Sequence, residues 1–187
     1  MNEQTTDSEL IQSARRGDSA AFGLVITRHH RAIHAYLLKL TANFHDAEDL
    51  TQDTFLHALG QLEKFDHQRP LLPWLFTIAR RQAITGWRKA KPLVPLDELE
   101  TAASADTPPI DFDIWDLARS HLPPLDFTAL WMHYQQDYPI KEIARILGKT
   151  GIHAKIILHR ARKKLRKRIE ETAPSVRARH QPETQIQ

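Results

Sequence analysis

Apolar residues recur every three or four positions through most of the chain, which is the spacing of amphipathic α-helices. Within residues 7–91, a turn and helix cap at Gly17, Asp18 and Ser19 precedes the longest periodic run. Its expected inward positions are Phe22, Val25, Ile26, Ile33, Tyr36, Leu37 and Leu40. Alternation of period two is weak and glycine is scarce, so the pattern predicts an all-α fold.

The segment DAEDLTQDTFLHALGQL, residues 46–62, predicts a second helix whose outward face is partly apolar. Asp46 is its expected N-cap, and Asp49 three residues later gives a carboxylate variant of the capping box. The expected inward residues are Leu50, Thr54, Ala58 and Leu62, and the outward ones are Asp49, Gln52, Asp53, Leu56 and Gly60. Outward acids near a helix N-terminus ordinarily stabilise the helix dipole. Exposed Leu56 among them is instead typical of a docking strip for another protein's helix.

The segment PWLFTIARRQAITGWRKAK, residues 73–91, predicts a third helix with Pro73 in its first turn. Its expected inner face is Leu75, Ile78, Ala79, Ala83 and Trp87. The outer face and edges carry Trp74, Thr77, Arg81, Ile84, Arg88 and Lys91. Cations interleaved with an aromatic ring suit a melted DNA strand, because Arg holds phosphates and rings stack on bases. The alternative is a solvated amphipathic helix with Trp74 packed into the core.

Charge divides the rest of the chain into an acidic linker and a basic domain. Residues 92–118 hold seven acids and no Lys or Arg, and residues 92–114, with their prolines and no periodicity, predict an extended linker. Residues 141–168 hold eleven Lys or Arg and one acid, which indicates an anionic partner. Residues 170–187 are polar and are expected to form a flexible tail.

Residues 115–169 are expected to form a second small helical domain that contains a helix-turn-helix. Its first helix carries an apolar stripe that ends at Gly148, the expected C-cap, and Thr150 then caps the second helix. The apolar stripe of the first helix is Ile140, Ile143, Ala144 and Leu147. That of the second helix is Ala154, Leu158, Ala161 and Leu165. A helical hairpin with a solvated basic face is the alternative. Eight bases without an acid between Lys155 and Arg168 favour a phosphate-binding helix.

Two isoleucines lie where a DNA-reading helix would ordinarily present polar side chains. At 100° per residue Ile156 projects away from the core, whereas Ile157 lies on the flank and is expected to be partly buried. An outward Ile can touch a thymine methyl but supplies no hydrogen bond to a base edge. This helix is therefore expected to hold the DNA backbone more than it reads sequence.

The composition also limits where the protein can act and which other functions it can have. The chain has no cysteine, a polar and acidic N-terminus, and no apolar run of about 18 residues, which predicts a cytoplasmic protein without signal peptide or membrane span. His30 and His34 have a metal-compatible spacing, but no carboxylate follows them in a motif pattern. We therefore expect no metal site, no cofactor and no enzymatic activity.

The motifs DAEDLTQDTFLHAL, PWLFTIARRQAITGWRK, IKEIARILG and LHRARKKLRKRI, in this order, resemble the extracytoplasmic-function sigma factors of bacterial RNA polymerase. The resemblance covers roughly residues 7–169. It implies a first domain that docks on a coiled coil of the largest polymerase subunit and opens promoter DNA at the minus-ten element. It implies a linker that runs through the polymerase, and a second domain that binds the minus-thirty-five element and the flap of the other large subunit. Core RNA polymerase, promoter DNA and an anti-sigma protein are the implied partners.

The resemblance also implies roles for individual residues. The polymerase-binding residues would be Asp49, Gln52, Asp53 and Leu56. The DNA-binding residues would be Trp74, Thr77, Arg80, Arg81, Arg88, Lys149, Thr150, His153, Lys155, Ile156, Arg160, Arg162 and Lys163.

The chain departs from the family in its DNA-reading elements. The loop FDHQRPLLPW lacks the usual Gly and Ser-Phe pair, Arg81 stands where Asn is common, and Ile156 and Ile157 replace a polar residue and an Arg. The docking helix keeps its pattern, so polymerase binding is expected to be intact and sequence reading changed or reduced, with a partner protein as one source of specificity. The rival interpretation is a helix-turn-helix regulator that dimerises through its first domain, which leaves the docking strip and linker unexplained.

Overall fold

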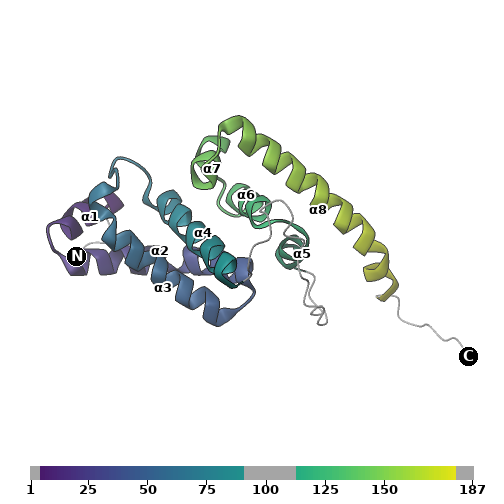
Figure 1. Ribbon diagram of the computed structural model, residues 1–187, viewed down its shortest axis with the longest axis horizontal. Helices are drawn as coiled ribbons and strands as arrows, with labels where there is room; N and C mark the ends of the chain where they lie inside the picture. Colours follow the sequence, from purple (N-terminus) through teal and green to yellow (C-terminus); the bar gives the residue numbers. More distant parts are fainter. Residues whose placement is uncertain (1–4, 91–112, 180–187) are drawn as a thin grey trace, which may run out of the picture.

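In a computed structural model, residues 5–90 and 113–179 are described; they form eight α-helices and one short 3-10 turn, and no strand occurs among them. The elements are α1 (Asp7–Arg15), α2 (Ser19–Thr41), α3 (Phe44–Gly60), η1 (Leu62–Lys64), α4 (Leu71–Ala90), α5 (Ile114–His121), α6 (Pro124–Tyr134), α7 (Ile140–Leu147) and α8 (Gly151–Arg179). Helices α1–α4 make an N-terminal lobe and α5–α8 a C-terminal lobe, with α8 lying along the outer side (Figure 1). The predicted all-α fold is confirmed.

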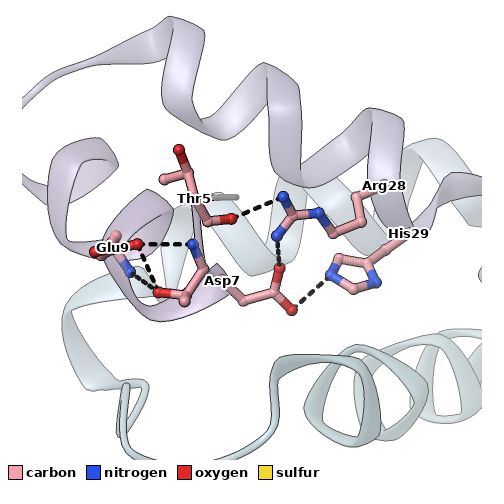
Figure 2. A network of polar contacts seen from close by, with 6 residues as sticks. Thr5, Asp7, Glu9, Arg28 and His29 are labelled. Atoms are coloured by element: carbon pink, nitrogen blue, oxygen red, sulfur yellow. Dashed lines mark hydrogen bonds and ion pairs between the residues drawn. The ribbon is translucent and has the colours of Figure 1, made fainter. Parts of the chain in front are cut away.

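A polar network holds α1 on α2 at the start of the chain. Thr6 and Glu9 form a reciprocal capping box, which satisfies free backbone donors at the start of α1. Figure 2 shows Asp7 between Arg28 and His29, with carboxylate contacts of 2.6 Å to the guanidinium and 2.9 Å to the imidazole. The predicted turn before α2 is confirmed, since Gly17 has a positive φ of 93° and Asp18 caps the helix.

The predicted inward residues of the N-terminal lobe whose side chains are described form its core or pack against it, whereas the side chain of Trp87 lies outside the described residues. All of those on α2 are buried except Ile26, which is half-buried against the core. Helix α3 begins earlier than expected, so the assignment of Asp46 as N-cap is wrong. Asn43 is the cap, because its side-chain oxygen accepts hydrogen bonds from the backbone N–H groups of His45 and Asp46 at 2.9 and 3.2 Å. Asp46 lies in the first turn, where its charge favours the helix dipole.

The helix-turn-helix lies at α7 and α8 as predicted. Gly148 ends α7 in the left-handed region, with φ 65° and ψ 38°, and its N–H and that of Lys149 bond back to α7 carbonyls. Thr150 then caps α8 through its hydroxyl, which accepts from the backbone N–H of His153 at 3.3 Å.

Helix α8 continues through Arg179, into the segment that the sequence predicts to be a flexible tail. Glu171 supports this continuation, because it pairs with Lys167 and Arg168 one turn earlier at 3.8 and 2.8 Å.

The two lobes pack directly on each other, which the sequence pattern did not predict. Helix α4 contacts α7, and α2 contacts both α5 and α6. At the centre, the hydroxyl oxygens of Tyr36 and Thr128 lie 2.8 Å apart and are buried, and burial raises the pKa of Tyr36 to about 12. Trp131 and Phe76 surround the Tyr36 ring, so one hydrophobic core runs through both lobes.

The predicted linker, apart from its last two residues, lies outside the described residues. Asp113 and Ile114 belong to the C-terminal lobe, where Asp113 caps α5 and Ile114 is its first residue. None of the helices in the described parts of the chain is long and apolar enough to cross a membrane.

Candidate docking and nucleic-acid interfaces

The outward face of α3 is exposed as the sequence predicts. Asp49, Gln52, Asp53 and Leu56 all face solvent, and 62% of Leu56 is accessible. On the opposite face Thr54 is buried, and its hydroxyl is satisfied by the Leu50 carbonyl at 2.6 Å. The spacing of the inward residues therefore fixes which residues α3 presents outward.

An apolar groove of about 320 Å³ lies beside this strip, between α2 and α3. Its lining residues are Phe22, Ile26, His30, Glu48, Thr51, Gln52, Phe55, Leu56 and Leu59. Leu56 and Gln52 thus belong both to the strip and to the groove, which makes this face larger than the sequence indicated.

His30, one of the two histidines at which no metal site is expected, lines this groove, and His34 lies beside His30. The rings of His30 and His34 stack with centroids 5.7 Å apart, and His34 Nε2 lies 3.3 Å from a Glu48 carboxylate oxygen. Among the residues that the structure describes, no group of three or more His, Asp or Glu side chains is arranged to hold a metal ion.

On α4, Trp74 is not free on the surface. It is half-buried, and its ring lies 4.5 Å from that of Phe65, centroid to centroid. The Thr77 hydroxyl donates to the Pro73 carbonyl at 3.0 Å. Both residues line a second pocket of about 540 Å³, whose other walls come from the loop after η1 and from Glu142 and Arg145 of α7. The C-terminal lobe therefore covers one side of this predicted DNA-facing surface.

The side chains of two of the three arginines predicted on this face are described, and they have different surroundings. Arg81 is exposed. Arg80 is half-buried between the lobes and donates from Nε to the Ile146 carbonyl at 3.0 Å, and its burial lowers the pKa of its guanidinium. The resemblance implies that Arg80 binds DNA, but in this arrangement α7 lies against it, and the DNA contact stays a prediction. The side chain of Arg88 lies outside the described residues.

The recognition helix presents most of its predicted contacts to solvent. Lys149, Thr150, His153, Lys155 and Ile156 are exposed. Ile157 is more buried than expected, at 7% exposure, because it packs on the core shared with α6 and α7.

The sequence did not single out Ile152, which is 74% exposed. A helical projection would have found it, since it lies one turn before Ile156.

Arg160 is engaged within the protein, and its DNA contact stays a prediction. Its Nη2 and Nε donate to the two carboxylate oxygens of Asp126 on α6, at 2.6 and 3.1 Å, and Asp126 is fully buried. Lys164 lies 3.9 Å from the same carboxylate. An acid inside the apolar run PLDFTALWMHY is the sequence signal for such a pair, because a buried carboxylate requires a cation.

The remaining predicted cations of α8 are exposed. The guanidinium carbon of Arg162 lies 5.3 Å from the centre of the Tyr134 ring, a cation–π contact that orients it. Lys163 has no acidic partner among the described side chains, so its charge is available to a phosphate.

Comparison with known proteins gives two family matches. Residues 25–92 match sigma-70 region 2, and residues 113–165 match sigma-70 region 4. The ECF RNA polymerase sigma factor SigM of Bacillus subtilis is 29% identical over 141 residues, which are 72% of this chain and 86% of SigM. The ECF RNA polymerase sigma factor SigW of the same organism is 27% identical over 179 residues, 86% of this chain and 95% of SigW.

Two solved structures share the fold. CnrH in complex with the cytosolic domain of CnrY has a TM-score of 0.66 at 21% identity, with 88% of this chain and 97% of CnrH covered. The sigma factor RpoE in complex with the anti-sigma factor NepR from Bartonella quintana has a TM-score of 0.64 at 22% identity, covering 80% and 96%. The region matches, the named relatives and the arrangement of helices agree, and the chain belongs to the extracytoplasmic-function sigma factors of the sigma-70 family.

Proposed function

We propose that this sigma factor docks on core RNA polymerase through α3, opens promoter DNA at the minus-ten element with its N-terminal lobe, and holds upstream DNA with α8. The single observation that carries the docking proposal is the exposed strip of Asp49, Gln52, Asp53 and Leu56 beside the apolar groove.

The composition of this face suits a basic, amphipathic helix of a partner. Leu56 has most of its surface in water, and covering it would remove that apolar area from solvent. The flanking carboxylates of Asp49 and Asp53 would accelerate encounter with a positively charged surface. The resemblance to the family implies that the partner helix belongs to a coiled coil of the largest polymerase subunit.

The N-terminal lobe would meet melted DNA through Arg81 and the region around Trp74. Arg80 can reach DNA only after the lobes separate, because its guanidinium is bonded to the Ile146 carbonyl of α7. Polymerase binding would supply that separation by holding the two lobes at different places.

Upstream binding would depend mainly on phosphates. Lys149, Lys155 and Lys163 are exposed and supply charge, whereas the outward Ile156 adds no hydrogen bond to a base edge. Readout of the minus-thirty-five element is therefore reduced, and a protein of the anti-sigma or guiding type is the partner we propose for regulation. The structures of CnrH and RpoE, each bound to another protein, support this part.

The docking proposal is tested with the double variant Asp53→Arg and Leu56→Asp. Both residues are exposed, so the fold should be kept while holoenzyme formation is abolished. The measurement is co-elution with core polymerase, with circular dichroism as the check on folding. Leu24→Asp is the matched control, because Leu24 is an exposed leucine of α2 that does not line the groove. Normal holoenzyme formation by the folded double variant would contradict the docking surface.

The phosphate proposal is tested with Lys163→Ala in the holoenzyme. Loss of one phosphate contact should weaken binding similarly on all upstream sequences and reduce the salt slope by about one unit. A sequence-dependent loss with an unchanged slope would contradict it.

A further inference from the structure

Two isoleucines one helical turn apart are exposed at the start of α8. Ile152 is 74% exposed and Ile156 is 55% exposed. They lie on the side of the helix opposite to the buried residues Ala154 and Leu158, as the helical period requires. A single exposed isoleucine is ordinary on a protein surface, but this pair makes a short apolar strip in the first two turns of the recognition helix.

Cations border the strip on its sides and beyond its end. Lys149 precedes it, Lys155 lies beside it, and Lys163 lies two turns after Ile156 on the same face. In the described part of the chain none of these three lysines pairs with an acidic side chain. The N-terminal residues of a recognition helix are those that reach base edges in the major groove, while flanking cations meet phosphates. The strip therefore lies at the base-contacting position of this helix.

We propose that Ile152 and Ile156 are specificity-determining residues that contact the 5-methyl groups of two nearby thymines in the upstream DNA. This inference rests on the proposed DNA-binding function. It identifies the base contacts by which α8 still reads DNA sequence. Thymine is the base that presents a methyl group in the major groove. A helical turn rises about 5.4 Å and base pairs are spaced about 3.4 Å, so the two methyls belong to neighbouring or next-neighbouring base pairs.

An acidic amphipathic helix of another protein would also complement the charges, but the length of the strip favours DNA. Docking of such a helix uses apolar anchors over two or more turns. Here the next positions on the same face are His159 and Lys163, which are polar and exposed. An apolar strip of one turn matches two methyl groups better than it matches the face of a helix.

The test removes only the methyl groups. Holoenzyme made from the full chain and core polymerase selects duplexes from a pool with a randomised segment upstream of a fixed minus-ten region. The selected duplex is then synthesised with deoxyuridine in place of each thymidine, which keeps every phosphate and hydrogen-bonding group. We expect thymines to be enriched at two nearby base pairs, and each uracil there to weaken binding about fourfold.

The isoleucine variants assign the two contacts. Ile152→Ala and Ile156→Ala should each remove the preference for thymine over uracil at one of the two positions. Leu24→Ala, which truncates an exposed leucine of the N-terminal lobe, should keep both preferences.

Equal binding of thymine and uracil duplexes by the wild-type holoenzyme would overturn the inference. An acidic helix of a partner protein would then be the better candidate to bind the two isoleucines. Alanine variants that keep the thymine preference would overturn the inference as well. Failure of the wild-type chain to form holoenzyme would instead overturn the proposed function from which the inference starts.

Discussion

At Gly148 one backbone conformation sets the angle between the two helices of the helix-turn-helix. Its φ of 65° lies in the left-handed region, and no atom lies within 4 Å of the position that a Cβ would occupy. The requirement for glycine is therefore conformational and does not come from a lack of space. Gly151, the first residue of α8, has equally open surroundings but no positive φ.

Gly148→Ala should lower the free energy of unfolding by about 1–2 kcal/mol, the cost of placing a side chain in the left-handed region. Gly151→Ala is the matched control and should leave stability unchanged or slightly raised, because alanine reduces the freedom of the unfolded chain. Urea unfolding followed by circular dichroism measures both. An equal loss of stability in the two variants would contradict the conformational explanation.

At the scale of the helices, α8 is held on α6 by a charged contact as well as by apolar packing. The carboxylate of Asp126 is fully buried, and both of its oxygens accept from Arg160, whose side chain is half exposed. Removing the cation would leave a buried carboxylate with only Lys164 nearby, whereas removing the carboxylate would leave an arginine that can still reach water.

Arg160→Ala should therefore destabilise the protein strongly, by about 3–5 kcal/mol if Lys164 does not compensate. Asp126→Ala combined with Arg160→Ala should be less destabilised than Arg160→Ala alone, since no buried charge remains. A thermodynamic cycle from urea unfolding of the wild type, the single variants Arg160→Ala and Asp126→Ala, and the double variant measures the coupling. If Arg160→Ala unfolds normally and only weakens DNA binding, its main role is the phosphate contact first predicted from sequence.

At the scale of the whole molecule, the lobes are joined by a buried hydroxyl pair. Thr128 donates its proton to the Pro124 carbonyl at 2.7 Å, so Tyr36 is the donor toward Thr128. Losing the acceptor would leave the Tyr36 hydroxyl buried and unpaired, whereas losing the donor leaves Thr128 still satisfied.

Thr128→Val should therefore cost about 1–3 kcal/mol, and Tyr36→Phe only about 0.5–1.5 kcal/mol. Because separation of the lobes would return the Tyr36 hydroxyl to water, Thr128→Val should also increase the radius of gyration measured by small-angle X-ray scattering. Equal costs for the two variants would contradict the assignment of donor and acceptor.

A second contact between the lobes is an ion pair, and its contribution to stability is predicted to depend on pH. Lys39 pairs with Asp113 and lies 3.5 Å from Asp116. Burial acts to raise the pKa of Asp113, but hydrogen bonds from Lys39 and from the Trp115 N–H outweigh it, and the pKa is lowered. Burial likewise acts to lower the pKa of Lys39, and the Asp113 and Asp116 carboxylates outweigh it, so this pKa is raised.

A carboxyl group whose folded pKa is lowered adds stability that is complete above its ordinary pKa of 3.8 and is lost as pH falls through the folded value. The raised pKa of Lys39 keeps the pair charged until strongly alkaline pH. Asp113→Asn should therefore lower the free energy of unfolding at pH 7, by less than about 1 kcal/mol for a partly exposed pair. The difference from wild type should shrink toward pH 3. A difference that persists there would show that the charge is not its cause.

Features that depend on one helix or on one backbone conformation could be predicted from the pattern of residues in both lobes. The outward strip of α3, the turn at Gly148, the cap at Thr150 and the outward Ile156 all follow from spacing along one helix or from a single backbone conformation. The first residue of α3 could not be predicted from spacing, because Asn43 and Asp46 are both residue types that suit an N-cap. Only the backbone conformation shows that Asn43 is the cap.

The sequence by itself determined the all-α fold, the helix-turn-helix and the residues that α3 turns outward, because these depend on neighbours within one or two turns. Only the tertiary structure decided the surroundings of Arg80, Arg160 and Tyr36, whose partners lie 66, 34 and 92 residues away. Helical periodicity places a side chain on a face but does not say which distant segment covers that face. For this reason Arg80, predicted to meet DNA, lies between the lobes, and Arg160 holds α8 on α6.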